Sequence, residues 1–163
     1  MNKQKILNEI NKTKEHLSNL VKKLEGCNER WKPNSCDPYY YIDAFGNVLS
    51  QIETGCYSDS AFWKSYNCFK TREQAETEAE NILVRRRLED IARRLNKGRK
   101  IDWNNYDQTK YFIFLDCKTQ LIERDGNLRN KIQGVVYCLD NNFRKIAIQE
   151  IGEERLKKYL KGE

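Results

Sequence analysis

The segment TREQAETEAENILVRRRLEDIARRLN, residues 71–96, predicts the long helix around which the rest of the fold is built. It contains neither glycine nor proline, and its first four residues form a capping box. In this motif Thr71 is the N-cap and Gln74 reaches back from the third helical position. Gly98 follows at the place where a helix C-terminus is expected. The pattern therefore predicts one helix that ends at about Asn96.

The second half of this helix separates apolar from basic side chains. At about 100° per residue, one face carries an apolar set that we expect to point into the core. This set is Leu88, Ile91, Ala92 and Leu95. Residues 85–100 hold eight basic and two acidic residues, a net charge of +6. The basic residues, which we predict to be the binding site, are Arg85, Arg86, Arg87, Arg93, Arg94, Lys97, Arg99 and Lys100.

Three of these cations form a row on the face opposite the apolar set. Arg86, Arg93 and Lys97 follow one another at spacings of seven and four residues, flanked by Arg87 and Arg94. Such a row can contact phosphates or an acidic protein surface. The alternative is a solvated face whose cations suit the C-terminal end of the helix dipole.

The residues before the long helix predict a β-hairpin followed by short elements. Residues 39–43 and 48–52 read as two strands joined by a turn at Phe45-Gly46-Asn47. A loop or short helix is expected over residues 58–66, and a short strand over residues 67–70.

The residues after the long helix predict three more strands and two helices. Residues 110–116 are apolar on both faces and indicate a central strand. Residues 119–123 and 134–139 predict two further strands, with a turn at Asp125-Gly126. Asn142 can cap a helix that runs to Glu150, and Gly152 separates it from a terminal helix over residues 153–160. In that last helix the residues expected to face inward are Leu156, Tyr159 and Leu160.

The N-terminal residues 2–29 predict an amphipathic helix with one narrow apolar stripe. The stripe consists of Ile6, Ile10, Thr13, Leu17, Leu20, Leu24 and Cys27, an a/d pattern over three heptads. Either a coiled coil through residues 6–27 makes a homodimer, or the helix lies on its own domain. Pro33 and Pro38 mark the joint to the body. We therefore predict an α+β chain in which helix 1–29 precedes a single domain, residues 30–163. That domain has a small antiparallel sheet, the long central helix and C-terminal helices.

The composition excludes a membrane protein and indicates a cytoplasmic one. The chain has 163 residues, 30 basic and 24 acidic, for a net charge of +6. Since residues 85–100 account for all of it, the other 147 residues balance at 22 basic and 22 acidic. No window approaches the roughly 18 to 20 apolar residues of a transmembrane helix. The first residues lack the apolar core of a signal peptide.

The six cysteines show no spacing typical of a metal site. No two stand in a CxxC arrangement, and His16 is the only histidine. We expect reduced cysteines that pack as small hydrophobic residues, with no metal and no cofactor.

The sequence contains no recognisable catalytic motif. It has no GxSxG elbow, phosphate-binding glycine loop or HExxH pattern. His16 falls on the polar side of the N-terminal helix, where we expect a solvated side chain. We therefore expect a binding protein rather than an enzyme.

Aromatic residues are concentrated in residues 31–69, which hold ten of the eighteen in the chain. Most are expected to pack in the core. Because neighbours on a strand face opposite ways, either Tyr40 or the pair Tyr39 and Tyr41 should face outward. Aromatic side chains suit protein interfaces, so Tyr39, Tyr41 and Trp63 join the predicted binding site.

Four motifs together resemble a recurrent set of small phage and prophage proteins of low-GC Gram-positive bacteria. They are RWKP at 30–33, YYYIDAFGNV at 39–48, NCFKTREQAE at 67–76 and IGEERLKKYL at 151–160. The resemblance covers most of residues 30–80 and the last 15 or so, and the arginine-rich run lies outside it. This family carries no assigned reaction, so the resemblance transfers no catalytic residue. It implies an accessory phage protein that acts in the host cytoplasm, where inhibitors of host defence such as anti-CRISPR proteins are common.

These observations predict a protein that acts stoichiometrically by binding. The leading hypothesis is an inhibitor of a host defence nuclease or its ribonucleoprotein, with nucleic acid or an acidic groove contacted through residues 85–100. One alternative is a nucleic-acid-binding protein in phage gene control. Another is a sponge for a nucleotide immune signal, in which Arg and Tyr clamp phosphate and base.

Overall fold

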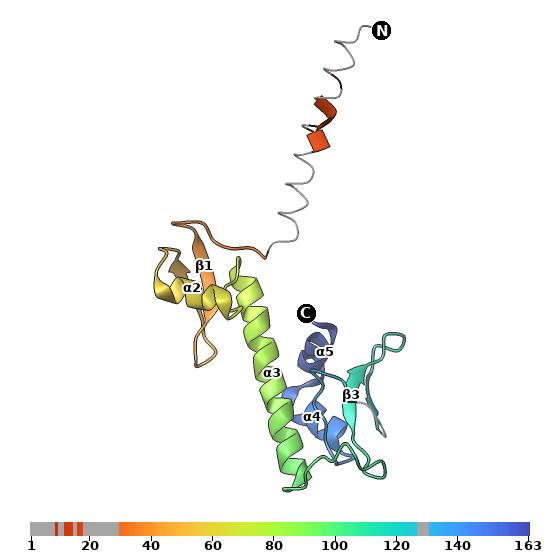
Figure 1. Ribbon diagram of the computed structural model, residues 1–163. Coiled ribbons are helices and arrows are strands. Elements are labelled where there is room, and N and C mark those ends of the chain that lie inside the picture. Colours follow the sequence, from red (N-terminus) through yellow and green to blue (C-terminus); the bar gives the residue numbers. More distant parts are fainter. Residues whose placement is uncertain (1–8, 10–11, 15, 18–29, 127–130) are drawn as a thin grey trace.

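The fold is α+β, as predicted, and is organised along one long helix (Figure 1). The computed structural model describes residues 9, 12–14, 16–17, 30–126 and 131–163. The elements in chain order are β1 (Pro38–Ile42), β2 (Val48–Ile52), α2 (Tyr57–Lys64), α3 (Arg72–Asn96), β3 (Phe112–Leu115), β4 (Ile122–Asp125), α4 (Phe143–Ile151) and α5 (Glu153–Lys161).

The predicted hairpin is confirmed. Strands β1 and β2 pair antiparallel, with Ile42 opposite Val48 at the turn end. Asp43 holds the turn, because its Oδ1 accepts hydrogen bonds from the backbone N–H groups of Phe45 and Asn47, both at 2.8 Å. Gly46 has a φ of 90°, a conformation that glycine adopts without strain. The hairpin and α2 together form a unit that we call the hairpin lobe (residues 30–70).

A buried carboxylate joins the three elements of the hairpin lobe. Asp59, at the start of α2, is 1% exposed, and Tyr39 of β1 donates its hydroxyl to Asp59 Oδ1 at 2.8 Å. Gln51 of β2 donates to the same oxygen at 2.8 Å. The other oxygen accepts from Thr54, through both N–H and hydroxyl, and from the N–H of Cys56. Five donors therefore compensate the burial of one negative charge.

Helix α3 begins and ends where the sequence predicts. Thr71 Oγ1 accepts from the N–H of Gln74, and Gln74 Oε1 accepts from the N–H of Thr71, each at 3.3 Å. Lys97 terminates the helix in the left-handed conformation. Its 25 residues span about 37 Å.

Helix α3 buries opposite faces in its two halves. Its first half contacts β1 and β2, while its second half belongs to the core formed with α4, α5 and β3. The side chains that face the hairpin recur at spacings of four and three, and so do those that face the core. The two sets are Ala75, Ala79 and Ile82, and Val84, Leu88 and Ile91. Each member of the second set follows its counterpart by nine residues, roughly 180° around the helix. Figure 1 shows the hairpin lobe and the C-terminal elements on opposite sides of α3.

The main core lies between α3 and the C-terminal lobe, residues 98–126 and 131–163. The predicted inward set of α3 is confirmed, since Leu88, Ile91 and Ala92 are buried and Leu95 packs against them. Leu156 of α5 is fully buried, and Tyr159 and Leu160 pack on this core as predicted. The remaining buried members are Val84, Ile113, Ile122, Cys138, Phe143, Ala147 and Ile151.

Four predicted strands differ from the structure. Residues 67–70 and 134–139 contribute single bridges, Tyr40 to Phe69 and Tyr111 to Cys138. Since β3 therefore pairs along its length with β4 alone, the prediction of a central strand over residues 110–116 is wrong. The strand expected over 119–123 is displaced to β4, because the carboxylate of Asp116 holds the preceding residues in a turn. The turn predicted at Asp125-Gly126 is not seen there, because Asp125 is still the last residue of β4, and residues 127–130 lie outside the described residues.

The two C-terminal helices match the prediction. Asn142 stands at the N-cap of α4, although its side chain makes no capping hydrogen bond. Gly152, with a φ of 96°, separates α4 from α5. The left-handed φ at this position explains why a glycine is used there.

The buried Lys110 has an internal role in the loop that follows α3. It is 2% exposed, and its ammonium donates to the backbone carbonyls of Asn105 and Gln108 at 2.8 Å. The same ammonium lies 5.5 Å from the ring centre of Trp103. These contacts compensate the buried charge and fold the loop around it.

The cysteines only partly follow the prediction. The five that the structure describes are free thiols. Cys68 and Cys138 are buried, but Cys36, Cys56 and Cys117 are exposed, so the expectation that the cysteines pack as small hydrophobic residues is wrong for these three. Cys27 lies outside the described residues.

The N-terminal helix is described at six residues only. Residues 9, 12–14 and 16–17 are helical, and Leu17 of the predicted stripe is 59% exposed. The rest of the predicted coiled coil lies outside the described residues, so dimerisation through residues 6–27 stays a prediction. No helix in the described ranges is long and apolar enough to cross a membrane.

We expect Asp59 to make folding sensitive to acid. Its hydrogen bonds, first those of Thr54, hold the pKa of this carboxyl well below its usual range. A lowered pKa stabilises the fold above the unfolded value of about 4, and the contribution is lost progressively as the pH falls below it. Asp59→Asn should therefore flatten the decline of the unfolding free energy between about pH 4 and pH 2, measured by urea denaturation.

Tyr39→Phe is the matched control. It removes one hydrogen bond to the same carboxylate and should lower the unfolding free energy at pH 7 by about 1.5–3 kcal/mol. Because the carboxylate remains, the acid dependence should persist. An Asp59→Asn variant with the wild-type decline would contradict this assignment.

Candidate binding surface

The eight predicted basic residues are all exposed, on the second half of α3 and the loop after it. Three of them are engaged in ion pairs. Arg85 pairs with Glu89 at 3.1 Å, and Arg93 pairs with Asp90 at 2.9 Å. Arg94 bridges to Asp90 at 3.1 Å and also to Glu150 of α4 at 2.5 Å. The two carboxylates raise the pKa of Arg94 further above its usual value.

The other five cations have no ion-pair partner in the part of the chain that the structure describes. Arg99 turns back and donates from Nε to the carbonyl of Asn96 at 3.1 Å, at the end of α3. Arg86, Arg87, Lys97 and Lys100 extend into solvent. The structure thus divides the basic run into cations that hold the fold and cations that are available to a partner.

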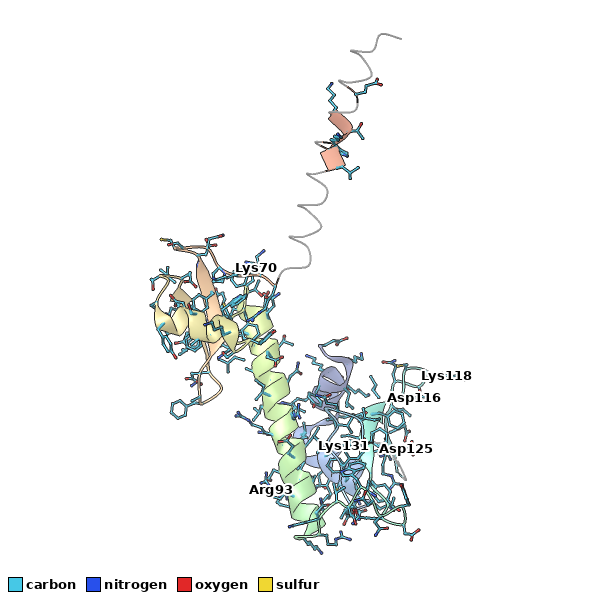
Figure 2. The ribbon with its side chains drawn as sticks, in the orientation of Figure 1. Lys70, Arg93, Asp116, Lys118, Asp125 and Lys131 are labelled. Atoms are coloured by element: carbon cyan, nitrogen blue, oxygen red, sulfur yellow. The ribbon has the colours of Figure 1, made fainter. Side chains whose placement is uncertain are left out.

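The basic row continues the helix face on which the hairpin packs. Beyond Ile82, the same spacing of four and three residues leads to Arg86, Asp90, Arg93 and Lys97. Figure 2 shows Arg93 on the side of α3 opposite β3. One face of α3 therefore changes along its length from apolar and covered to basic and open.

A groove lies where the hairpin meets this face, and we call it the hairpin groove. Its volume is about 640 Å³. The apolar lining comes from Ile42 and Val48 of the hairpin and from Ala79, Ile82 and Leu83 of α3. Phe45, at the tip of the turn, also borders it and is 91% exposed.

The charges on the rim of the hairpin groove are mostly compensated within the protein. Arg72 pairs with Glu76 at 2.8 Å, and this partner raises the pKa of Arg72. Glu80 accepts a two-pronged hydrogen bond from Arg155 of α5, which lowers the pKa of Glu80. Arg86 is the cation of the rim that keeps no such partner among the described residues.

The hairpin turn fixes one further charge of the rim, the carboxylate of Asp43. Asp43 accepts hydrogen bonds from the side chain and backbone of Asn47, and these bonds lower the pKa of Asp43. This carboxylate is thus held negative in the lining of the hairpin groove.

The predicted aromatic residues do not join this surface. Tyr39 is 0% exposed, and burial and the bond to Asp59 raise its pKa, so the expectation that Tyr39 faces outward as part of a binding surface is wrong. Tyr41 faces the same way and stacks on Phe62 at 4.3 Å. Since neighbours on β1 alternate, these tyrosines point to α2, while Tyr40 and Ile42 point away from it. Tyr39 and Tyr41, the pair for which the sequence allowed an outward orientation, therefore face inward.

Trp63 lies on α2 beside two cations. The guanidinium of Arg30 is 5.1 Å from its ring centre and 4.2 Å from that of Tyr66, and the ammonium of Lys32 is 5.4 Å from Trp63. Arg30 also donates to the Trp63 carbonyl. These contacts attach the chain before β1 to α2, so they give Trp63 a structural role.

The residues that line the hairpin groove were not predicted. Two of them, Ala79 and Ile82, continue a stripe that begins at the buried Ala75, at spacings of four and three residues, and this is a signal the sequence does carry. Phe45 is a large apolar residue inside a predicted turn, where small polar residues are usual.

The described residues contain no cluster of His, Cys, Asp and Glu side chains suited to a metal ion. His16 is exposed. The thiol of Cys56, at the start of α2, lies 2.9 Å from the hydroxyl of Ser58, and this hydrogen bond lowers the pKa of Cys56.

Comparison with known protein families, curated proteins and solved structures found no match to this chain. The relation to small phage proteins therefore stays a prediction from the four sequence motifs.

We expect the paired and the free cations to differ in their effect on stability. Arg94→Gln should lower the urea midpoint slightly, because the bridge from Asp90 to Glu150 is lost, and the loss should shrink in 1 M NaCl. Arg86→Gln, which removes no ion pair, should leave the midpoint unchanged. Equal losses from both substitutions would show that Arg86 also holds the fold.

Proposed function

We propose that this protein acts by stoichiometric binding, as a phage accessory protein that inhibits a host defence nuclease or its ribonucleoprotein in the host cytoplasm. The observation that carries the proposal is the set of exposed, unpaired cations on α3, foremost Arg86, Arg87 and Lys97. The resemblance to phage proteins supplies the biological context. The anti-CRISPR proteins are the class of inhibitor that this combination suits.

The position of Arg86 and Arg87 argues against a purely solvated helix face. Basic residues in the last turn of a helix are favoured by its dipole, which accounts for Arg93 and Arg94. Arg86 stands ten residues before the end of α3, close to three turns away, where the dipole contributes little. Arg86 and Arg87 are exposed and form no ion pair among the described residues, so a binding role explains them better than a contribution to stability does.

The interleaved carboxylates favour a protein partner over free nucleic acid. Asp90 lies within the basic row, and Asp43 and Glu76 border the hairpin groove beside it. These charges would repel a phosphate backbone that ran along the same face. A protein surface can place its own acidic groups opposite selected cations only.

Charge reversal on α3 tests the proposal. The triple variant Arg86→Glu, Arg87→Glu and Lys97→Glu should reduce capture of the partner from nuclease-treated host lysate by at least about tenfold. It should equally abolish protection of phage from the host defence. Circular dichroism should show a folded chain, since these residues make no ion pairs in the described structure.

The matched control carries the same change of charge elsewhere. Lys118, Lys131 and Lys161 are exposed, and Lys118 lies on the far side of the C-terminal lobe from Arg93 (Figure 2). Their replacement by Glu should leave capture and protection intact. If the α3 triple variant is as active as this control, the proposed function through α3 is wrong. Tight, steeply salt-dependent binding of free DNA or RNA would favour the gene-control alternative instead.

A further inference from the structure

We propose that the hairpin groove seats one helix of the partner protein, and that this helix is amphipathic and acidic toward its end over Arg86. The inference rests on the proposed binding function and names the chemistry of the partner. It concerns residues outside the predicted basic site, namely Ile42, Phe45, Val48 and Leu83.

The floor of the groove offers apolar contacts that the protein itself leaves uncovered. Leu83 of α3 is 41% exposed, although Ala79 and Ile82 beside it are half-buried by the hairpin. Phe45 extends from the turn with 91% of its surface exposed. Because Asp43 holds the turn and Phe45 borders the lining, the Phe45 ring is placed to extend the apolar surface of the groove.

The dimensions of the groove suit a helix. Its lining on α3 runs from Arg72 to Arg86, about 21 Å along the helix axis, or close to four turns. One wall is α3 and the other is the β1–β2 hairpin, which is the geometry that accepts an amphipathic helix through anchors at every third or fourth residue. Phe45 closes one side and would contact the apolar face of such a helix.

The charges along the groove indicate where the bound helix should carry its own charged side chains. At the start of the groove, Arg72 is neutralised by Glu76, and further along Glu80 is neutralised by Arg155. Two charges of the lining stay without an ion-pair partner among the described residues: the cation of Arg86, at the end from which the basic row continues, and the carboxylate of Asp43, which neutral donors of the turn contact. An occupant with apolar residues over Leu83, a carboxylate over Arg86 and a basic side chain facing Asp43 therefore complements the groove in both respects.

A second copy of this chain complements the groove less well. Its predicted amphipathic segment, residues 1–29, contains six lysines and four glutamates. A net positive helix would oppose Arg86 and Lys97 rather than pair with them. Nucleic acid is disfavoured for the converse reason, because Asp43 and the other rim carboxylates would face its phosphates.

Photo-crosslinking from the turn identifies the occupant. The full-length protein, with p-benzoylphenylalanine in place of Phe45, is irradiated in the natural host during phage infection, and the crosslinked peptide is sequenced. The matched control carries the same group in place of Tyr57, which is 90% exposed on the same lobe but does not line the groove. We expect position 45, and not position 57, to crosslink to an acidic amphipathic helix of the protein that charge reversal on α3 releases.

The corresponding synthetic peptide then tests the contact. Its affinity should fall at least tenfold with Leu83→Gln and with Arg86→Gln. Leu121→Gln, at a residue 50% exposed in the turn before β4, should leave it unchanged. Glutamine keeps helix propensity, so a loss with Leu83→Gln reports the apolar contact rather than unfolding.

Four outcomes overturn the inference. They are a crosslink to nucleic acid, a crosslink to another copy of this chain, equal crosslinking from positions 45 and 57, and a peptide that binds as well to Leu83→Gln as to the native protein. If the partner is lost by charge reversal on α3 but none of the expected groove effects appears, the groove inference fails and the proposed function stands. If charge reversal on α3 leaves the partner bound, the proposed function fails, and the inference fails with it.

Discussion

The structure depends on one constraint, namely that α3 buries two faces that lie about half a turn apart. Ala75, Ala79 and Ile82 meet the hairpin, and Val84, Leu88 and Ile91 meet the C-terminal core. The offset of nine residues within each pair sets the angle between the lobes. A change of one residue in this offset would rotate one lobe by about 100° relative to the other. The absence of glycine and proline from the helix keeps this angle fixed.

The candidate surface follows from the same arrangement, because the hairpin is shorter than the helix it covers. Its strands have five residues each, whereas α3 has 25. Beyond the turn of the hairpin, the same face of α3 is therefore uncovered, and the residues on it are those of the basic row. The Asp59 network holds Tyr39 against α2 and so directs the alternate strand residues, including Ile42, toward α3. An apolar groove and a cationic face then meet at Arg86. That junction is what a partner with both apolar and acidic groups can recognise.

Local signals predicted much of this fold. The capping box, the hairpin turn and Gly152 determine where elements begin and end, and each acts within a few residues. Most of the strand errors arose where tertiary context decides, whereas the shift of β4 follows from the local turn that Asp116 holds. Cys138, for example, pairs at one residue only because the chain passes β3 briefly on its way to α4.

Only part of the candidate site was predicted from the sequence. The cations are visible in the sequence, but the bond of Arg94 to Glu150 joins residues 56 apart, and only the folded chain distinguishes paired from free arginines. The alternation of β1 left two choices for the tyrosines, and Asp59 decides between them by accepting the hydroxyl of Tyr39.

The most direct test of this account is native-state hydrogen exchange along α3. If the helix is one continuous connector packed on both faces, the amides from about residue 76 to residue 95 should exchange slowly as a single cooperative unit. Protection should be unbroken from Ile82 to Val84, where the buried face changes from the hairpin side to the core side. Fast exchange at these three residues, with separate protection before and after them, would contradict the account. The two lobes would then move independently, and the junction at Arg86 would not be a fixed surface.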